Sequence, residues 1–135
     1  MLALVPLMVF PFALYNLAML GLMGSGGVTS LQNQIISLNM MSGAVWTLSL
    51  GDLFILIALV LLFVEILKAT RASRFSVFDH MFSMFVFIAF LIEFLLVKDA
   101  ATQIFFILMT ISFIDVIAGF TISIRSAGRD VSIGL

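Results

Sequence analysis

The sequence contains no cysteine, a single histidine, two prolines and few charged residues. The absence of cysteine excludes disulfide bonds, thiolate metal ligands and thiol redox chemistry. Charged residues make up 10% of the chain, whereas a soluble domain has about 25%. The formal net charge of −1 provides no basic face of the kind that binds nucleic acid. The solvent of such a chain is therefore lipid, and nucleic acid is not an expected partner.

The residue patterns of common enzyme classes are also missing. His80 is the only histidine, which excludes a haem held by two histidines. It lies near the end of an apolar stretch, so we expect an interfacial histidine rather than the base that activates a nucleophile. Lys68 and Lys98 stand at the edges of apolar stretches, where a buried Schiff base is not expected. There is no phosphate-binding loop or zinc-protease signature. We therefore expect no enzyme, no cofactor and no metal site.

Long apolar stretches fill most of the chain, and 64% of its 135 residues are hydrophobic. A bilayer core about 30 Å thick is crossed by about 20 helical residues. The sequence predicts four transmembrane helices at about residues 2–23, 52–68, 77–97 and 101–124, with an extracytoplasmic connection at 24–51. One transmembrane domain then accounts for residues 1–135. The predicted fold is an all-α, antiparallel bundle of four transmembrane helices.

The orientation of this bundle follows from the basic residues beside the spans, because cytoplasmic loops are rich in lysine and arginine. The basic residues that would share one side are Lys68, Arg71, Arg74, Arg125 and Arg129. The other side would hold Lys98 alone. This imbalance predicts that both termini are cytoplasmic in a multi-pass protein of the plasma or inner membrane.

The connection at 24–51 carries no charge and begins with several glycines. Leu31, Ile35 and Leu38 recur at helical spacing, which predicts a short amphipathic or re-entrant segment along the membrane interface. Trp46 fits an aromatic belt before the next span. A packed connecting loop is the simplest role for this segment, and a substrate gate or a docking surface for a partner is the alternative.

Three carboxylates lie inside the apolar stretches, where a charge is costly. Glu65 is one helical turn from Lys68, so we expect an ion pair near the cytoplasmic interface. Glu93 lies deeper, and either a packing hydrogen bond or a functional acid would explain it. Asp115 is about 15 Å along the helix from Arg125, near the middle of the bilayer.

Asp115 shares one helix face with Ser112, Gly119 and Ser123, a small and polar stripe that favours close helix packing. Asn16 has a similar predicted depth, so we expect it to be the partner of Asp115 in the bundle interior. The residues of the candidate intramembrane polar site are Asp115, Glu93, Asn16 and Ser112. Asp115 either fixes the helix register, relays protons or cations, or contacts another subunit.

Two functions are compatible with these features. The first is a non-catalytic membrane protein that works through lateral contacts, as an accessory, assembly or structural subunit of a larger membrane complex. The second is a small oligomeric channel or a proton- or cation-coupled transporter that uses Asp115 and Glu93. The expected partners are the lipid bilayer and either another membrane protein or further copies of the chain.

Overall fold

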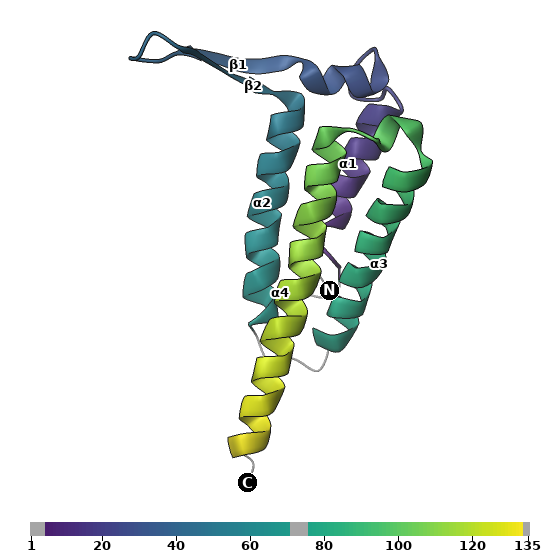
Figure 1. The fold of residues 1–135 in the computed structure, drawn as a ribbon, viewed down its shortest axis with the longest axis vertical. Helices are drawn as coiled ribbons and strands as arrows, with labels where there is room; N and C mark the ends of the chain where they lie inside the picture. The colour runs from purple at the N-terminus through teal and green to yellow at the C-terminus, as the bar shows by residue number, and fades with distance from the viewer. Residues whose placement is uncertain (1–4, 71–75, 134–135) are drawn as a thin grey trace.

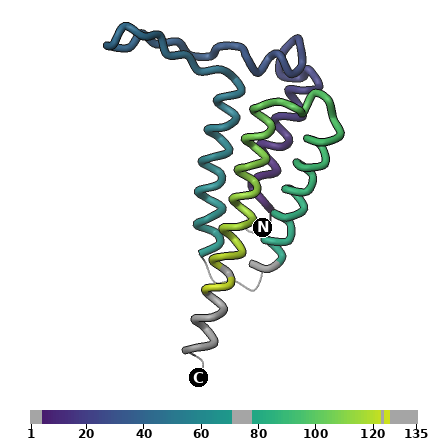
Figure 2. The backbone as a smooth tube through the Cα atoms, in the orientation of Figure 1, coloured from purple at the N-terminus to yellow at the C-terminus, as the bar shows by residue number. Residues whose placement is uncertain are grey.

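The computed structural model describes the backbone of residues 5–70 and 76–133 (Figure 1). Side chains are described throughout this part except at 76, 77, 123 and 126–133, which Figure 2 shows in grey. In chain order the elements are α1 (Val9–Met19), η2 (Gly27–Gln32), β1 (Gln34–Asn39), β2 (Val45–Ser49), α2 (Leu50–Ala69), α3 (Ser76–Leu96), η3 (Lys98–Ala100) and α4 (Gln103–Ile133).

The four α-helices form an antiparallel bundle (Figure 1). Helices α1 and α3 run in one direction, and α2 and α4 run in the other. Helix α4 packs against both α2 and α3, while α1 packs against α2. The two strands lie at one end of the bundle, here called the hairpin end, and α4 finishes at the opposite end, here called the terminal end.

Three segments are long and apolar enough to cross a membrane: Leu50–Ala69, Phe78–Leu96 and Gln103–Ile122. They correspond to the second, third and fourth predicted spans. Helix α1 is apolar but has 11 residues, about half the number that a span needs. Three helices could therefore cross a membrane by length and composition, and α1 is shorter than the predicted span at 2–23.

The bounds of α1 have a physical cause at each end. Helix α1 begins at Val9, so Pro11 lies in its first turn. The missing N–H of a proline costs nothing there, because the first-turn N–H groups have no partner within the helix. Gly21 then adopts a positive φ of 82°, a conformation that favours glycine and turns the chain away from the helix axis.

Helix α2 begins with a reciprocal cap at the end of β2. The backbone N–H of Asp52 donates to Ser49 Oγ at 3.2 Å, and the N–H of Ser49 donates to Asp52 Oδ2 at 3.1 Å. This pattern is a capping box, and the carboxylate of Asp52 also suits the positive end of the helix dipole. The cap fixes the direction in which the chain leaves the hairpin.

The segment between α1 and α2 is not the amphipathic helix that the sequence predicted. It contains the short helix η2 and an antiparallel hairpin in which Leu38 pairs with Trp46 and Asn39 pairs with Val45. The strands are rich in β-branched and aromatic residues, which favour extended backbone. Gly43, with a φ of 90°, closes the turn. The all-α prediction is therefore correct for the bundle and wrong for the connection.

The centre of the bundle is filled by an apolar layer, defined here as Phe54, Ala58, Phe90, Phe105 and Leu108. Each of these side chains is at most 2% exposed. The rings of Phe90 and Phe105 lie 5.3 Å apart between their centroids. In α3, Phe90 stands between Ser83 and Glu93 in the sequence. The apolar layer therefore separates the polar side chains near the hairpin end from those near the terminal end.

Candidate functional site

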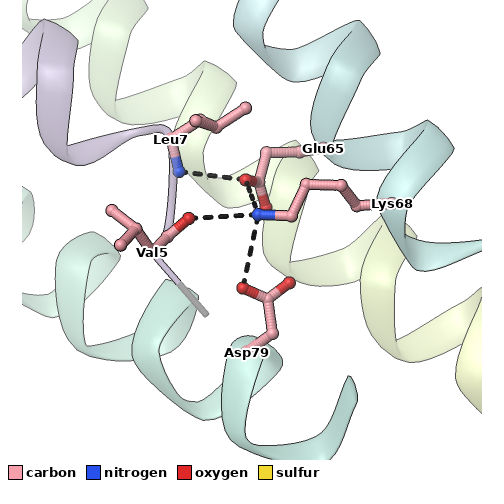
Figure 3. A network of polar contacts seen from close by, with 5 residues as sticks. All are labelled: Val5, Leu7, Glu65, Lys68 and Asp79. Carbon is pink, nitrogen blue, oxygen red and sulfur yellow. Dashed lines mark hydrogen bonds and ion pairs between the residues drawn. The ribbon is translucent and has the colours of Figure 1, made fainter. Parts of the chain in front are cut away.

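The polar interior of the terminal half, here called the charged cluster, consists of Glu65, Lys68, Asp79, Ser83 and Asp115. Lys68 Nζ lies 2.9 Å from Glu65 Oε1 and 3.6 Å from Asp79 Oδ1 (Figure 3). Glu65, Asp79, Ser83 and Asp115 are buried. The cluster therefore joins α2, α3 and α4 through charges that lie largely out of contact with solvent.

The positions of these residues in their helices suit their charges. Lys68 lies in the last turn of α2, where the partial negative charge of the helix end favours a cation. Asp79 lies in the first turn of α3, where the partial positive charge favours an anion. Because α2 and α3 are antiparallel, these two ends meet and bring the charges together.

The charged cluster also holds the segment that precedes α1. The backbone N–H of Leu7 donates to Glu65 Oε1 at 2.9 Å, and Lys68 Nζ donates to the carbonyl oxygen of Val5 at 3.0 Å (Figure 3). The N-cap residue of α1, Met8, makes no side-chain cap. Glu65 and Lys68 thus satisfy backbone groups of a remote segment, in addition to forming the ion pair expected from the sequence.

Asp115 lies in the bundle interior beside the hydroxyl of Ser83, and its charge is coupled to those of Glu65, Asp79 and Lys68. Two of these partners are acids, so Asp115 lies in a region of excess negative charge. Among the side chains that the structure describes, Asp115 Oδ2 and the hydroxyl of Ser83 are buried without a hydrogen bond of ordinary geometry.

The expected pair of Asn16 and Asp115 does not form among the described residues. Asn16 Nδ2 instead donates to Glu93 Oε2 at 3.2 Å and to the carbonyl oxygen of Phe12 at 2.8 Å. The reason is the shortness of α1: it ends at Met19, so Asn16 lies in its last turns at the hairpin end. Asp115 lies on the other side of the apolar layer. Of the four candidate residues, Asn16 and Glu93 therefore lie in the hairpin half of the bundle. Ser112 and Asp115 lie on the terminal side.

Gly119 marks a close approach between α3 and α4, as its place in the small and polar stripe indicated. A Cβ atom on this glycine would lie 2.6 Å from Nδ1 of His80, so the imidazole fills the space that a side chain would occupy. The ring of His80 also lies 5.8 Å from that of Phe120. The single histidine is thus buried between α3 and α4.

Several predicted residues cannot be placed. Arg71 and Arg74 lie outside the described residues, as do the side chains of Arg129 and Ser123. Arg125 is exposed. The roles of these residues in topology and packing stay predictions.

Neither Ser83 nor Asp79 was identified as a site residue from the sequence. Their spacing of four residues, which puts both on one face of a helix, was the available signal. The sequence analysis also missed Tyr15, whose hydroxyl donates to the carbonyl oxygen of Asp99 at 2.8 Å and lies 2.7 Å from Thr102 Oγ1. This contact ties α1 to the start of α4.

The chemistry of the charged cluster is that of charge and hydrogen bonding. Within the described part of the chain, no three histidine, cysteine or acidic side chains are grouped so that they could hold a metal ion. The cluster links α2, α3 and the N-terminal segment through ion pairs and hydrogen bonds. Comparison of the chain with protein-family models, with curated proteins and with solved structures finds no match.

Proposed function

We propose that this chain is a non-catalytic integral membrane protein that acts through lateral contacts, as an accessory or structural subunit of a larger membrane assembly. The observation that carries the proposal is the hairpin of β1 and β2, which extends sideways beyond α2 and away from α3 (Figure 1). A lateral arm of this kind adds little to the bundle from which it projects, but it places side chains within reach of a neighbouring protein.

The surface of the arm suits a protein contact. No residue between Gly24 and Gly51 is charged. Exposed apolar side chains occupy both strands and the turn: Ile35, Ile36, Leu38, Met40, Met41, Val45 and Trp46. An isolated two-stranded hairpin is marginally stable in water, so this surface gains stability from whatever covers it.

The outer face of α2 supports the same proposal. Leu56, Val60 and Phe63 are exposed, and a shallow groove of about 250 Å³ is lined by apolar side chains of this helix alone. A helix that is apolar on all sides faces lipid or a larger assembly. The arm and the adjoining helix together offer a continuous surface for a membrane partner.

The topology within this proposal has four spans, with α1 and its flanking residues completing the first. Both termini are then cytoplasmic, and the hairpin lies on the outside of the plasma or inner membrane. The alternation of the four helices between the two ends of the bundle supports this arrangement.

The alternative function, an oligomeric channel or ion-coupled transporter, is favoured by one observation, the buried acids of the charged cluster. The apolar layer weighs against it, because Phe90, Phe105 and Leu108 stand between Asp115 and Glu93 along the helices. A transport path through one bundle needs these acids on a common polar route. Flux measured in liposomes, with Asp115→Asn as the variant, tests this alternative.

A cross-linking experiment tests the proposed contact. Because the chain has no cysteine, Met41→Cys introduces a unique thiol at the fully exposed turn of the hairpin, to which a photoreactive group can be attached in native membranes. Lys98→Cys is the matched control, since it is exposed at the same end of the bundle. We expect one defined adduct from Met41→Cys and none from the control. No adduct, or the same adducts from both positions, would overturn the proposal.

A further inference from the structure

We propose that the seam between α3 and α4 binds one monovalent cation, a sodium ion in competition with a proton, at the carboxylate of Asp115 and the hydroxyl of Ser83. This site is independent of the lateral contacts proposed above, because it lies inside the bundle rather than on its surface. It also differs from the transport alternative, since it requires binding but no passage between the two halves.

The first step is that four buried side-chain oxygens on α3 and α4 make no hydrogen bond of ordinary geometry. Among the described side chains these are Asp79 Oδ1, Ser83 Oγ, Ser112 Oγ and Asp115 Oδ2. Their residues are 5%, 2%, 0% and 5% exposed. Asp79 Oδ1 is in the ion pair with Lys68 at 3.6 Å, which leaves the oxygens of Ser83, Ser112 and Asp115. An unsatisfied buried polar group costs about 1–3 kcal/mol, so these three oxygens favour an occupant that they can bind.

The second step is the arrangement of these atoms. Asp79 and Ser83 lie one turn apart on α3, and Ser112 and Asp115 lie one turn apart on α4. The contact between His80 and Gly119 draws the two helices together beside the cluster. Asp115 and Ser83 face each other directly, so they form the centre of the site, with Asp79 toward the terminal end and Ser112 toward the apolar layer.

The third step is charge. The titratable groups that face Asp115 are Glu65 and Lys68 of α2 and Asp79 with its neighbour His80 on α3. Among the described residues, three carboxylates therefore surround one lysine, so negative groups outnumber positive ones in this part of the bundle. A cation that enters this site offsets repulsion as well as completing the coordination of the oxygens.

The fourth step is the class of cation. The candidate ligands are carboxylate and hydroxyl oxygens, which are hard donors suited to alkali and alkaline-earth ions rather than to soft metals. Helix α4 contributes one acid, and Asp79 already contacts Lys68 at 3.6 Å. A divalent ion needs more carboxylate ligands than this, whereas a sodium ion or a proton needs only Asp115 with neighbouring hydroxyls.

Carbodiimide labelling provides a direct test. Dicyclohexylcarbodiimide modifies protonated carboxyls in apolar surroundings, and mass spectrometry locates the adduct. For the purified chain in nanodiscs we expect labelling at Asp115 that sodium chloride suppresses and choline chloride does not. At a sodium concentration ten times its Kd, the labelling rate should fall about tenfold. Suppression should be stronger at higher pH, because fewer protons then compete.

Variants separate the site from general effects of salt. Glu93→Gln is the matched control, because Glu93 lies outside the charged cluster and is bonded to Asn16. Sodium protection should persist in Glu93→Gln and weaken in Ser83→Ala, a variant that keeps Asp115 available for labelling. In Asp115→Asn the adduct should disappear.

The outcomes assign the occupant. Labelling that depends on pH but not on sodium would show a proton site and overturn the sodium assignment. Equal suppression by choline and sodium, or no labelling of Asp115 at any pH, would overturn the proposal as a whole. Neither result bears on the contact at Met41, so this proposal and the proposed function fail separately.

Discussion

At the scale of single residues, the contact between Gly119 and His80 limits the size of the side chain that position 119 can carry. A Cβ atom at position 119 would come within 2.6 Å of the imidazole, so Gly119→Ala should force α3 and α4 apart. Overpacking of this kind costs about 1–3 kcal/mol. Thermal unfolding in detergent, followed by circular dichroism, should show a lower Tm.

The double variant supplies the control for this prediction. His80→Ala removes the ring that the new methyl group would meet, so Gly119→Ala should cost much less in that background. The two substitutions are then non-additive, as expected for residues in contact. Additive losses would mean that Gly119 matters for a reason other than the imidazole.

Glu65 is expected to anchor the N-terminal segment, because its carboxylate accepts from both Leu7 N–H and Lys68 Nζ. Glu65→Ala removes the acceptor of the Leu7 N–H and the ion pair with Lys68, and breaking a buried ion pair costs about 3–5 kcal/mol. In a Leu7→Cys background the variant should speed maleimide labelling of the thiol. Glu93 pairs with Asn16 and not with the N-terminal segment, so the control variant Glu93→Ala should leave the labelling rate unchanged.

The residue-scale predictions from sequence succeeded where the partner lay within one helix. The pair of Glu65 and Lys68 follows from a spacing of one turn, and the structure has it at 2.9 Å. The pair of Asn16 and Asp115 depended on the relative heights of two helices. That height could not be read from the sequence, because α1 ends several residues earlier than its apolar stretch.

At the scale of elements, the hairpin is the largest departure from the sequence prediction. Ile35 and Leu38 fit a helical stripe with Leu31, but they lie in β1 while Leu31 is buried in η2. In a short segment, the same apolar residues can fit both the helical spacing of three to four residues and the two-residue spacing of a strand. The turn at Gly43 and the β-branched residues on both sides were the better signals.

Trp46 provides a native probe of the hairpin, since it is the only tryptophan in the chain. The hairpin projects from the start of α2, roughly perpendicular to the helices and away from the bundle (Figure 1), which places it at the membrane surface if α2 spans the bilayer. In nanodiscs without a partner, we expect Trp46 emission to be quenched more by lipids brominated near the headgroup than by lipids brominated near the chain end.

A different quenching pattern would contradict a position of the hairpin at the membrane surface. Strong quenching by aqueous acrylamide, with no effect of brominated lipids, would place the hairpin in water away from the bilayer. A Trp46→Phe variant, which removes the only tryptophan, supplies the background signal. The arrangement of the strands does not depend on this substitution, because both rings favour extended backbone.

At the scale of the whole molecule, the direction of the chain through the membrane can be measured with single cysteines. Val5→Cys and Arg125→Cys should react with an impermeant maleimide only after the membrane is opened, while Met41→Cys should react in intact cells. All three positions are exposed. Labelling of Val5→Cys and Met41→Cys from the same side would mean that α1 does not complete a span.

The global architecture was more predictable than its details. Long apolar stretches and the positions of capping residues determine where α2, α3 and α4 begin, because a bilayer leaves few alternatives to helices. The partition of the interior into two polar groups and an apolar layer depends on which residues meet across helices. That requires the heights and rotations of all four helices, which no single segment encodes.

The central claim is that the chain is a subunit of a larger membrane assembly. Native mass spectrometry of the affinity-tagged protein, extracted from its own membrane in a mild detergent, tests it most directly. We expect a stoichiometric complex with a different membrane protein, and the partner should be the one that cross-links to Met41→Cys. A lone monomer, or an oligomer that contains only this chain, would contradict the claim and turn attention to ion flux through Asp115.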